Sequence, residues 1–165
     1  MIAARRLDGR FWRILSPRWA HDPLSGAGAA RHGGRWNRPG QPALYLSQEL
    51  DTATAEYQQE VGTRPGTFVA YEVAAATLYD LTSADGAIAL GLSPADLVAP
   101  WKEIAFVKHR EPPGWIIADR LAKVGDGLLV PSVQRPGGVN LVLWRWNGEA
   151  GPTVTVHDPL GDLAL

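Results

Sequence analysis

The chain has 165 residues, of which 45% are apolar and 20% charged, and it contains no cysteine. This size and composition are typical of one compact globular domain, so we expect residues 1–165 to form a single domain and not a disordered or fibrous protein. A sequence without cysteine excludes disulfide bridges, thiol catalysis and the usual structural zinc sites.

The net charge of −1 conceals an uneven distribution of charge along the chain. Residues 1–38 hold eight arginines against two aspartates, whereas acidic side chains outnumber basic ones in residues 39–165. We therefore expect the N-terminal quarter to bind an anion, which the count alone leaves open as a nucleotide phosphate, a nucleic acid or an acidic partner.

Membrane and metal chemistry are not expected from the sequence. No apolar run approaches the roughly 20 residues that cross a bilayer, and the arginines near the N-terminus are followed by no apolar signal segment. The four histidines lack metal-ligand spacing. We expect a cytoplasmic protein without a bound metal.

In chain order, the first half reads as short elements separated by glycine and proline. The patterns predict a strand at 11–15, a long connection at 16–34, a buried strand at 43–46, a helix at 50–61 and a strand at 68–74. The apolar positions of the helix give it an inward face of Leu50, Ala53, Tyr57 and Val61.

The second half begins with helices and ends with strands. Helical segments are expected near 83–90, 94–97, 102–107 and 115–123, the last ended by Gly125, and strands at 128–130, 140–146 and 153–156, with a turn at Asn147-Gly148. Strands at both ends with helices between them predict a mixed α+β domain and argue against a Rossmann fold.

Common nucleotide and hydrolase motifs are absent from the sequence. Its glycines form neither a P-loop nor a G-x-G-x-x-G fingerprint, and no G-x-S-x-G elbow exists. Kinase, classical dehydrogenase and serine hydrolase readings are therefore disfavoured.

The run from Arg31 to Asn37 carries two arginines, Arg31 and Arg35, around Gly33-Gly34. Planar guanidinium donors suit a diphosphate, and glycines let backbone N–H groups approach a ligand closely. The alternative is an arginine-rich turn anchored by a buried tryptophan.

Two further pairs complete the candidate site. A strand carrying Tyr45 precedes the helix that carries Glu56, an order that can bring both to one cleft; the alternative for Glu56 is a solvated acidic face. Later in the chain a strand arrives at Ser132, and Asn140 opens the next strand after a Pro-Gly-Gly turn. Ser132 either donates a hydrogen bond to a ligand or satisfies a local turn.

Taken together, these segments resemble the RES domain family. The matching runs are Gly-Gly-Arg-Trp-Asn at 33–37, Tyr-Leu-Ser at 45–47, Ala-x-Ala-Glu at 53–56, and Val-Pro-Ser-Val at 130–133 followed by Asn140. The resemblance places the family's Arg, Tyr, Glu and Ser on Arg35, Tyr45, Glu56 and Ser132.

The resemblance implies a fold like that of ADP-ribosyltransferases, with a mixed β core and flanking helices, and the activity of a bacterial toxin that consumes NAD+ as co-substrate. A helix-turn-helix antitoxin is the implied partner. Glu56 would stabilise the oxocarbenium-like ribose; its alternative roles are to hydrogen-bond a ribose hydroxyl or to orient the acceptor. Arg35 and Arg31 would bind the diphosphate, Tyr45 would stack on nicotinamide, and Ser132 and Asn140 would complete the NAD+ site.

The acceptor of the ADP-ribose remains open between a protein side chain, phosphate and water. We take a target protein as the expected acceptor, although Thr54 stands where many protein ADP-ribosyltransferases carry a second Glu or Gln, which keeps NAD+ hydrolysis and phosphorolysis as the alternative. The rival from another class is a non-catalytic binding module with a basic N-terminus. The near-neutral charge and the lack of a nucleic-acid-binding motif disfavour it, and we expect no direct nucleic-acid binding.

Overall fold

The structure is a computed structural model that describes residues 4–59 and 61–163. Its strands form one six-stranded sheet in the order β1-β2-β5-β4-β3-β6. Their bounds are β1 Arg5–Leu15, β2 Leu44–Ser47, β3 Thr67–Asp80, β4 Gly127–Pro131, β5 Val139–Leu143 and β6 Thr153–Val156. The pair β3–β4 is parallel and the other pairs are antiparallel.

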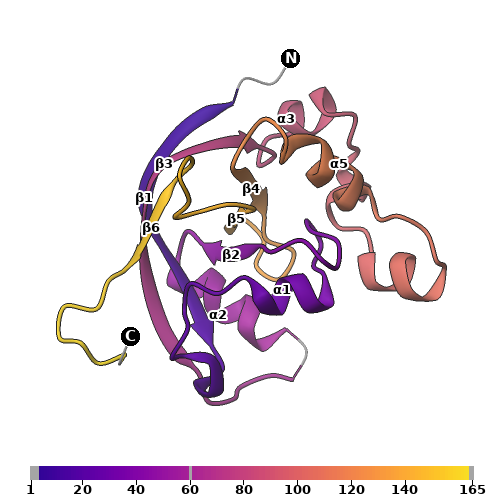
Figure 1. The fold of residues 1–165 in the computed structure, drawn as a ribbon. Coiled ribbons are helices and arrows are strands. Elements are labelled where there is room, and N and C mark those ends of the chain that lie inside the picture. The colour runs from indigo at the N-terminus through magenta and orange to yellow at the C-terminus, as the bar shows by residue number, and fades with distance from the viewer. Residues whose placement is uncertain (1–3, 60, 164–165) are drawn as a thin grey trace.

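The sheet curls back on itself through its two long strands. β1 pairs with β3 along its whole length and also meets β2 at one position, Trp12 opposite Ser47. The pairings β1-β2-β5-β4-β3 therefore form a ring, and Figure 1 shows β1 and β3 curving side by side along one side of the molecule. This curvature brings the end of β1 close to β2 and to the helix that follows β2.

Both faces of the central strands are covered by apolar side chains. Leu129, Leu141 and Leu143 pack in one core with β1, β3 and β6, whereas Leu128 and Val142 pack in a second core. Successive residues of a strand point to opposite faces, so this alternation explains why β4 and β5 read as continuous apolar runs.

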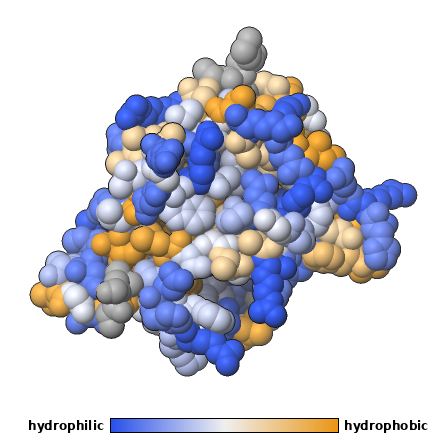
Figure 2. Space-filling view, in the orientation of Figure 1, coloured by the Kyte–Doolittle hydropathy of each residue, from blue (hydrophilic) through white to orange (hydrophobic). Residues whose placement is uncertain are grey.

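The helices lie around the sheet. In chain order they are α1 Ala27–His32, α2 Leu50–Gln58, α3 Ala84–Ala89, α4 Pro94–Leu97 and α5 Pro113–Leu121, with the short turns η1 Pro17–Trp19 and the π-helical η2 Glu103–Val107. α3 and α5 cover the second core, and α1 and α2 lie together at the opposite end in Figure 1. Polar side chains cover most of the face shown in Figure 2, with separate hydrophobic patches between them.

Capping residues explain where the middle helices start. The Ser83 hydroxyl accepts a hydrogen bond from Gly86 N at the start of α3. Ser93 and Asp96 form a reciprocal capping box at the start of α4. Among the described residues, no helix is both long enough and apolar enough to span a bilayer.

The predicted mixed α+β fold is confirmed, and the strands predicted at 43–46, 128–130 and 153–156 lie within one residue of those observed. Strands β1 and β3 are longer than predicted, and β5 ends at Leu143, before Trp146. The predicted connection at 16–34 contains η1 and α1, because short helices without an apolar face leave no periodic pattern.

The predicted inward face of α2 is wrong at both ends. The helix ends at Gln58, Leu50 is 38% exposed and Val61 is 66% exposed, whereas Thr52 and Ala53 are buried. Residue 60, inside the predicted helix, lies outside the described residues. Thr52 faces Gly138, where an added Cβ would lie 2.6 Å from the Thr52 hydroxyl, so a residue far along the chain decides which side of the helix is buried.

Candidate functional site

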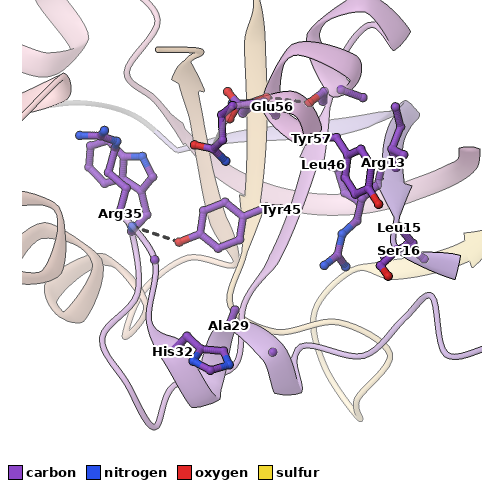
Figure 3. A pocket seen from close by; sticks show the side chains of 18 of the residues that line it. Arg13, Leu15, Ser16, Ala29, His32, Arg35, Tyr45, Leu46, Glu56 and Tyr57 are labelled. Carbon is purple, nitrogen blue, oxygen red and sulfur yellow. Dashed lines mark hydrogen bonds between the residues drawn. The ribbon is translucent and has the colours of Figure 1, made fainter. Parts of the chain in front are cut away.

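One cavity collects most of the residues predicted for the site. It has a volume of about 1270 Å³, and its wall includes Arg31, Arg35, Tyr45, Glu56 and Asn140. Figure 3 shows Arg35, Tyr45 and Glu56 around a common space, each from a different element. Small-molecule sites typically occupy roughly 300–1000 Å³, so the cavity has room for a ligand as long as a dinucleotide.

The loop after α1 is built around the hydroxyl of Tyr45. Trp36 N donates to Tyr45 Oη at 3.0 Å, and Tyr45 Oη donates to Asn37 Oδ1 at 2.7 Å. A Cβ at Gly34 would lie 2.4 Å from Tyr45 Oη, so only glycine fits at this position. Burial raises the pKa of Tyr45 far above its usual value, so its hydroxyl stays protonated and keeps both bonds.

Two indoles fasten the same loop to the rest of the fold. Trp115 Nε1 donates to Gly34 O at 2.8 Å, and Trp144 Nε1 donates to Trp36 O at 2.9 Å. At the start of α5 a Cβ on Gly114 would lie 2.1 Å from Arg35 O, so glycine lets the helix touch the loop. The backbone that carries Arg35 is therefore held on several sides.

Glu56 is positioned by two donors from other elements. Its Oε1 accepts a 2.6 Å bond from Ser132 Oγ and a 2.7 Å bond from Asn140 Nδ2. Asn140 Oδ1 in turn accepts a 2.8 Å bond from Ser47 Oγ, which identifies the amide end that faces Glu56. Because both described bonds use Oε1, the carboxylate is fixed while Oε2 is left to meet a ligand.

Ser132 and Arg31 differ from the other predicted residues in where they lie. Ser132 is 7% exposed, follows β4 directly and stands behind Glu56, outside the residues that line the cavity. Arg31 is exposed in the last turn of α1, so it reaches the cavity at its rim. The structure thus brings Arg35, Tyr45, Glu56 and Asn140 together directly, and Ser132 through its bond to Glu56.

The electrostatics of Arg35 link it to the carboxylate. Burial lowers the pKa of Arg35, and the negative charge of the nearby Glu56 opposes that shift. The Arg35 Nη1 group donates to Ala99 O, which anchors the guanidinium near the segment between α4 and η2. Arg35 and Glu56 also line the same cavity.

Arg13 is a cavity residue that the sequence analysis missed. It lines the cavity from β1, and burial lowers its pKa, with the neighbouring Tyr71 opposing that shift. Among residues 4–59 and 61–163, no ion pair joins Arg13 to a carboxylate. The sequence could have indicated this role, because Arg13 interrupts the otherwise apolar run from Phe11 to Leu15.

The described part of the chain offers no cluster of three or more potential metal ligands among its His, Asp and Glu side chains. The site consists instead of one fixed carboxylate, a half-buried aromatic ring and several guanidinium groups. A carboxylate of this kind can stabilise positive charge on a sugar, and guanidinium groups bind phosphate oxygens.

The chain is similar to known proteins in sequence and in fold. The family model described as RES domain matches residues 10–165. Proteins named NAD(+) phosphorylase MbcT from Mycobacterium tuberculosis and Mycobacterium bovis are each 32% identical over 146 residues, which cover 79% of this chain and 70% of the relative. A solved structure, the Mycobacterium tuberculosis MbcT-MbcA toxin-antitoxin complex, has a similar fold, with a TM-score of 0.66 at 22% identity over 95% of this chain and 88% of the other.

Proposed function

Because the chain belongs to the RES domain family, we propose that it is the toxin of a toxin-antitoxin pair and cleaves NAD+ with inorganic phosphate as acceptor. The relatives named NAD(+) phosphorylase support phosphate over the protein acceptor that the sequence analysis expected. The observation that carries the proposal is the Glu56 carboxylate, held by Ser132 and Asn140 in a cavity that arginines also line.

The reaction breaks the bond between the nicotinamide nitrogen and C1′ of the ribose that carries it. The same carbon is numbered 1″ in the name of the product. The electron pair of that bond passes to the pyridinium ring, which leaves as neutral nicotinamide, so no proton is needed by the leaving group. Positive charge develops on the ribose, and Glu56 stabilises it. A phosphate oxygen then bonds to C1′, and the product is ADP-ribose 1″-phosphate.

The remaining residues bind and orient NAD+. Arg13 is partly buried, lines the cavity and has no carboxylate partner among the described residues, so it is the best placed to hold the diphosphate, with Arg31 assisting at the rim. Tyr45 presents its ring to the cavity while its hydroxyl holds the loop, which suits stacking on the nicotinamide. Asn140 and Ser132 keep Glu56 in place.

An antitoxin would cover this cavity. The solved structure of similar fold is a toxin-antitoxin complex, and this chain exposes apolar side chains on the cavity wall at Trp19, Val61 and Phe106. A partner that buries these side chains would also block the entry of NAD+. We propose a helix-turn-helix antitoxin as that partner and the cytoplasm, where NAD+ and phosphate are both present, as the place of action.

The test is a product analysis with purified protein and NAD+ labelled in the adenosine. The protein is incubated with and without inorganic phosphate, and separately with cell lysate. We expect nicotinamide release that depends on phosphate and label in ADP-ribose 1″-phosphate. Label in ADP-ribose alone would indicate hydrolysis, label on a protein band would indicate protein modification, and no nicotinamide release under any condition would overturn NAD+ cleavage.

A further inference from the structure

Two guanidinium groups flank the Glu56 carboxylate from different directions. In Figure 3, Arg35 lies on one side of Tyr45 and Glu56, and Arg13 lies on the other. Arg35 comes from the loop after α1, whereas Arg13 comes from β1, so no single element positions both. A cavity with cations at two separate places is suited to two anionic groups.

The two arginines have different neighbours. Glu56 and Tyr45 are electrostatic neighbours of Arg35, whereas Tyr71 is the neighbour of Arg13. Arg35 is therefore the cation electrostatically linked to the carboxylate that acts at ribose C1′. Arg13 lines the cavity from β1, together with its neighbours Trp12 and Ile14.

A second hollow reaches Arg35 from outside the main cavity. It has a volume of about 310 Å³, and Pro100, Trp101 and Arg35 are among its lining residues. Since a water molecule occupies about 30 Å³ in the liquid, the hollow has room for a hydrated phosphate ion. Arg35, Gln59, Trp101 and Lys102 line both spaces, and Glu103 also lines the hollow, so the hollow adjoins the main cavity at Arg35.

The chemistry of phosphorolysis requires this separation of anions. The diphosphate of NAD+ is attached to the ribose at C5′, whereas the incoming phosphate must bond to C1′. The two anionic groups therefore approach the ring at different atoms, and one cation cannot hold both in place.

We propose that Arg35, at the junction of the two hollows, forms the binding site for the inorganic phosphate that attacks C1′. This inference rests on the proposed function and names the second substrate's place within that site. It replaces the expectation that Arg35 clamps the diphosphate. After the bond to nicotinamide breaks, one phosphate oxygen forms the bond to C1′, and Arg35 holds the other oxygens through charge-assisted hydrogen bonds.

The experiment measures the KM for phosphate and the KM for NAD+ separately, each with the other substrate at saturation. For Arg35→Gln we expect the KM for phosphate to rise by roughly tenfold or more and the KM for NAD+ to change less than about threefold. The fraction of product that is ADP-ribose instead of ADP-ribose 1″-phosphate should also increase. Arg35→Lys keeps the charge but loses the bidentate geometry, so its KM for phosphate should fall between those of wild type and Arg35→Gln.

Arg13→Gln and Arg10→Gln are the matched comparisons. Arg13→Gln should raise the KM for NAD+ and leave the KM for phosphate nearly unchanged. Arg10 lies on the same strand, is ion-paired with Glu72 and does not line the cavity, so Arg10→Gln should change neither constant.

Two different results would separate the inference from the function on which it rests. A wild-type protein that releases nicotinamide equally well without phosphate would refute phosphorolysis before any variant is measured. If wild type requires phosphate but folded Arg35→Gln and Arg35→Lys raise only the KM for NAD+, phosphorolysis stands and the assignment of Arg35 is wrong.

Discussion

Ser132 Oγ donates a 2.6 Å hydrogen bond to Glu56 Oε1 although 76 positions separate the two residues in the chain. The Ser132 hydroxyl oxygen also accepts a 3.0 Å bond from Arg135 N, so its own hydrogen is directed at the carboxylate. Ser132 is 7% exposed, which keeps water from competing for this bond. The carboxylate therefore has its orientation before any ligand enters the cavity, which lowers the cost of ordering it during the reaction.

Replacing Glu56 by glutamine tests the role of the charge with the hydrogen bonds retained. The glutamine carbonyl can still accept from Ser132 and Asn140, so we expect the fold to remain and Tm to change by only about 1–2 °C. Nicotinamide release should fall by roughly 10²-fold or more because the ribose cation loses its counter-charge. Glu72→Gln is the control, since Glu72 pairs with Arg10 away from the cavity. Full turnover in folded Glu56→Gln would remove this residue from the mechanism.

Ser47 is expected to act through Asn140 and not on the ligand. Its hydroxyl donates to Asn140 Oδ1, which turns Nδ2 toward Glu56. For Ser47→Ala we expect kcat to fall by about threefold to tenfold, because the amide loses one of its two orienting bonds, while the KM for NAD+ stays nearly constant. Ser47→Thr, which keeps a hydroxyl, should recover part of the loss.

A double-mutant cycle separates this positioning role from simple destabilisation. If Ser47 acts through Asn140, then adding Ser47→Ala to Asn140→Ala should lower kcat no further. Additive losses from the two substitutions would show that Ser47 contributes by another route.

Tyr45→Phe should weaken the fold of the loop that carries Arg35. The change removes the acceptor of Trp36 N and the donor to Asn37 Oδ1, and Asn37 is fully buried. Leaving such groups unpaired costs about 1–3 kcal/mol, so thermal unfolding should show a Tm lower by several °C. Because the ring is retained, stacking on the nicotinamide should persist at temperatures where the variant is folded. An unchanged Tm would contradict the role of this hydroxyl in the loop.

The burial of Tyr71 predicts that the folded protein loses stability at high pH. Its side chain is fully buried, its hydroxyl donates to Pro23 O at 2.8 Å, and burial raises the pKa of Tyr71 to about 12. The protonated form is thus favoured in the folded state, so its contribution is complete below about pH 10, the pKa in an unfolded chain, and is lost as pH rises from 10 to 12. The shift of about two units corresponds to at most roughly 3 kcal/mol.

Denaturant unfolding of wild type and Tyr71→Phe between pH 8 and pH 12 checks this expectation. The variant loses the bond to Pro23, so its free energy of unfolding should be lower by about 1 kcal/mol at pH 8. From pH 10 upward its free energy of unfolding should decline less steeply than that of wild type. Parallel curves for the two proteins would show that the pKa of Tyr71 is the same in the folded and unfolded states, which would contradict the expected shift.

The sequence by itself determined the local features of this protein. Periodicity and turn residues located most elements, and the ordered runs around Arg35, Tyr45, Glu56 and Ser132 indicated the RES domain family, which the family comparison confirms. These features are readable because strand and helix periods, caps and turns depend on residues close together in the chain. The roles assigned to the individual site residues remain predictions.

The tertiary structure decided which of these side chains meet, and how. Arg13 enters the cavity because β1, which pairs with β3, also curves to meet β2, and a local sequence pattern does not show which distant elements a strand will face. Ser132 supports Glu56 from behind because β4 ends beside α2, a contact between elements far apart in the chain. Such hydrogen bonds depend on strand pairing and helix packing over long separations, for which a local pattern holds no information.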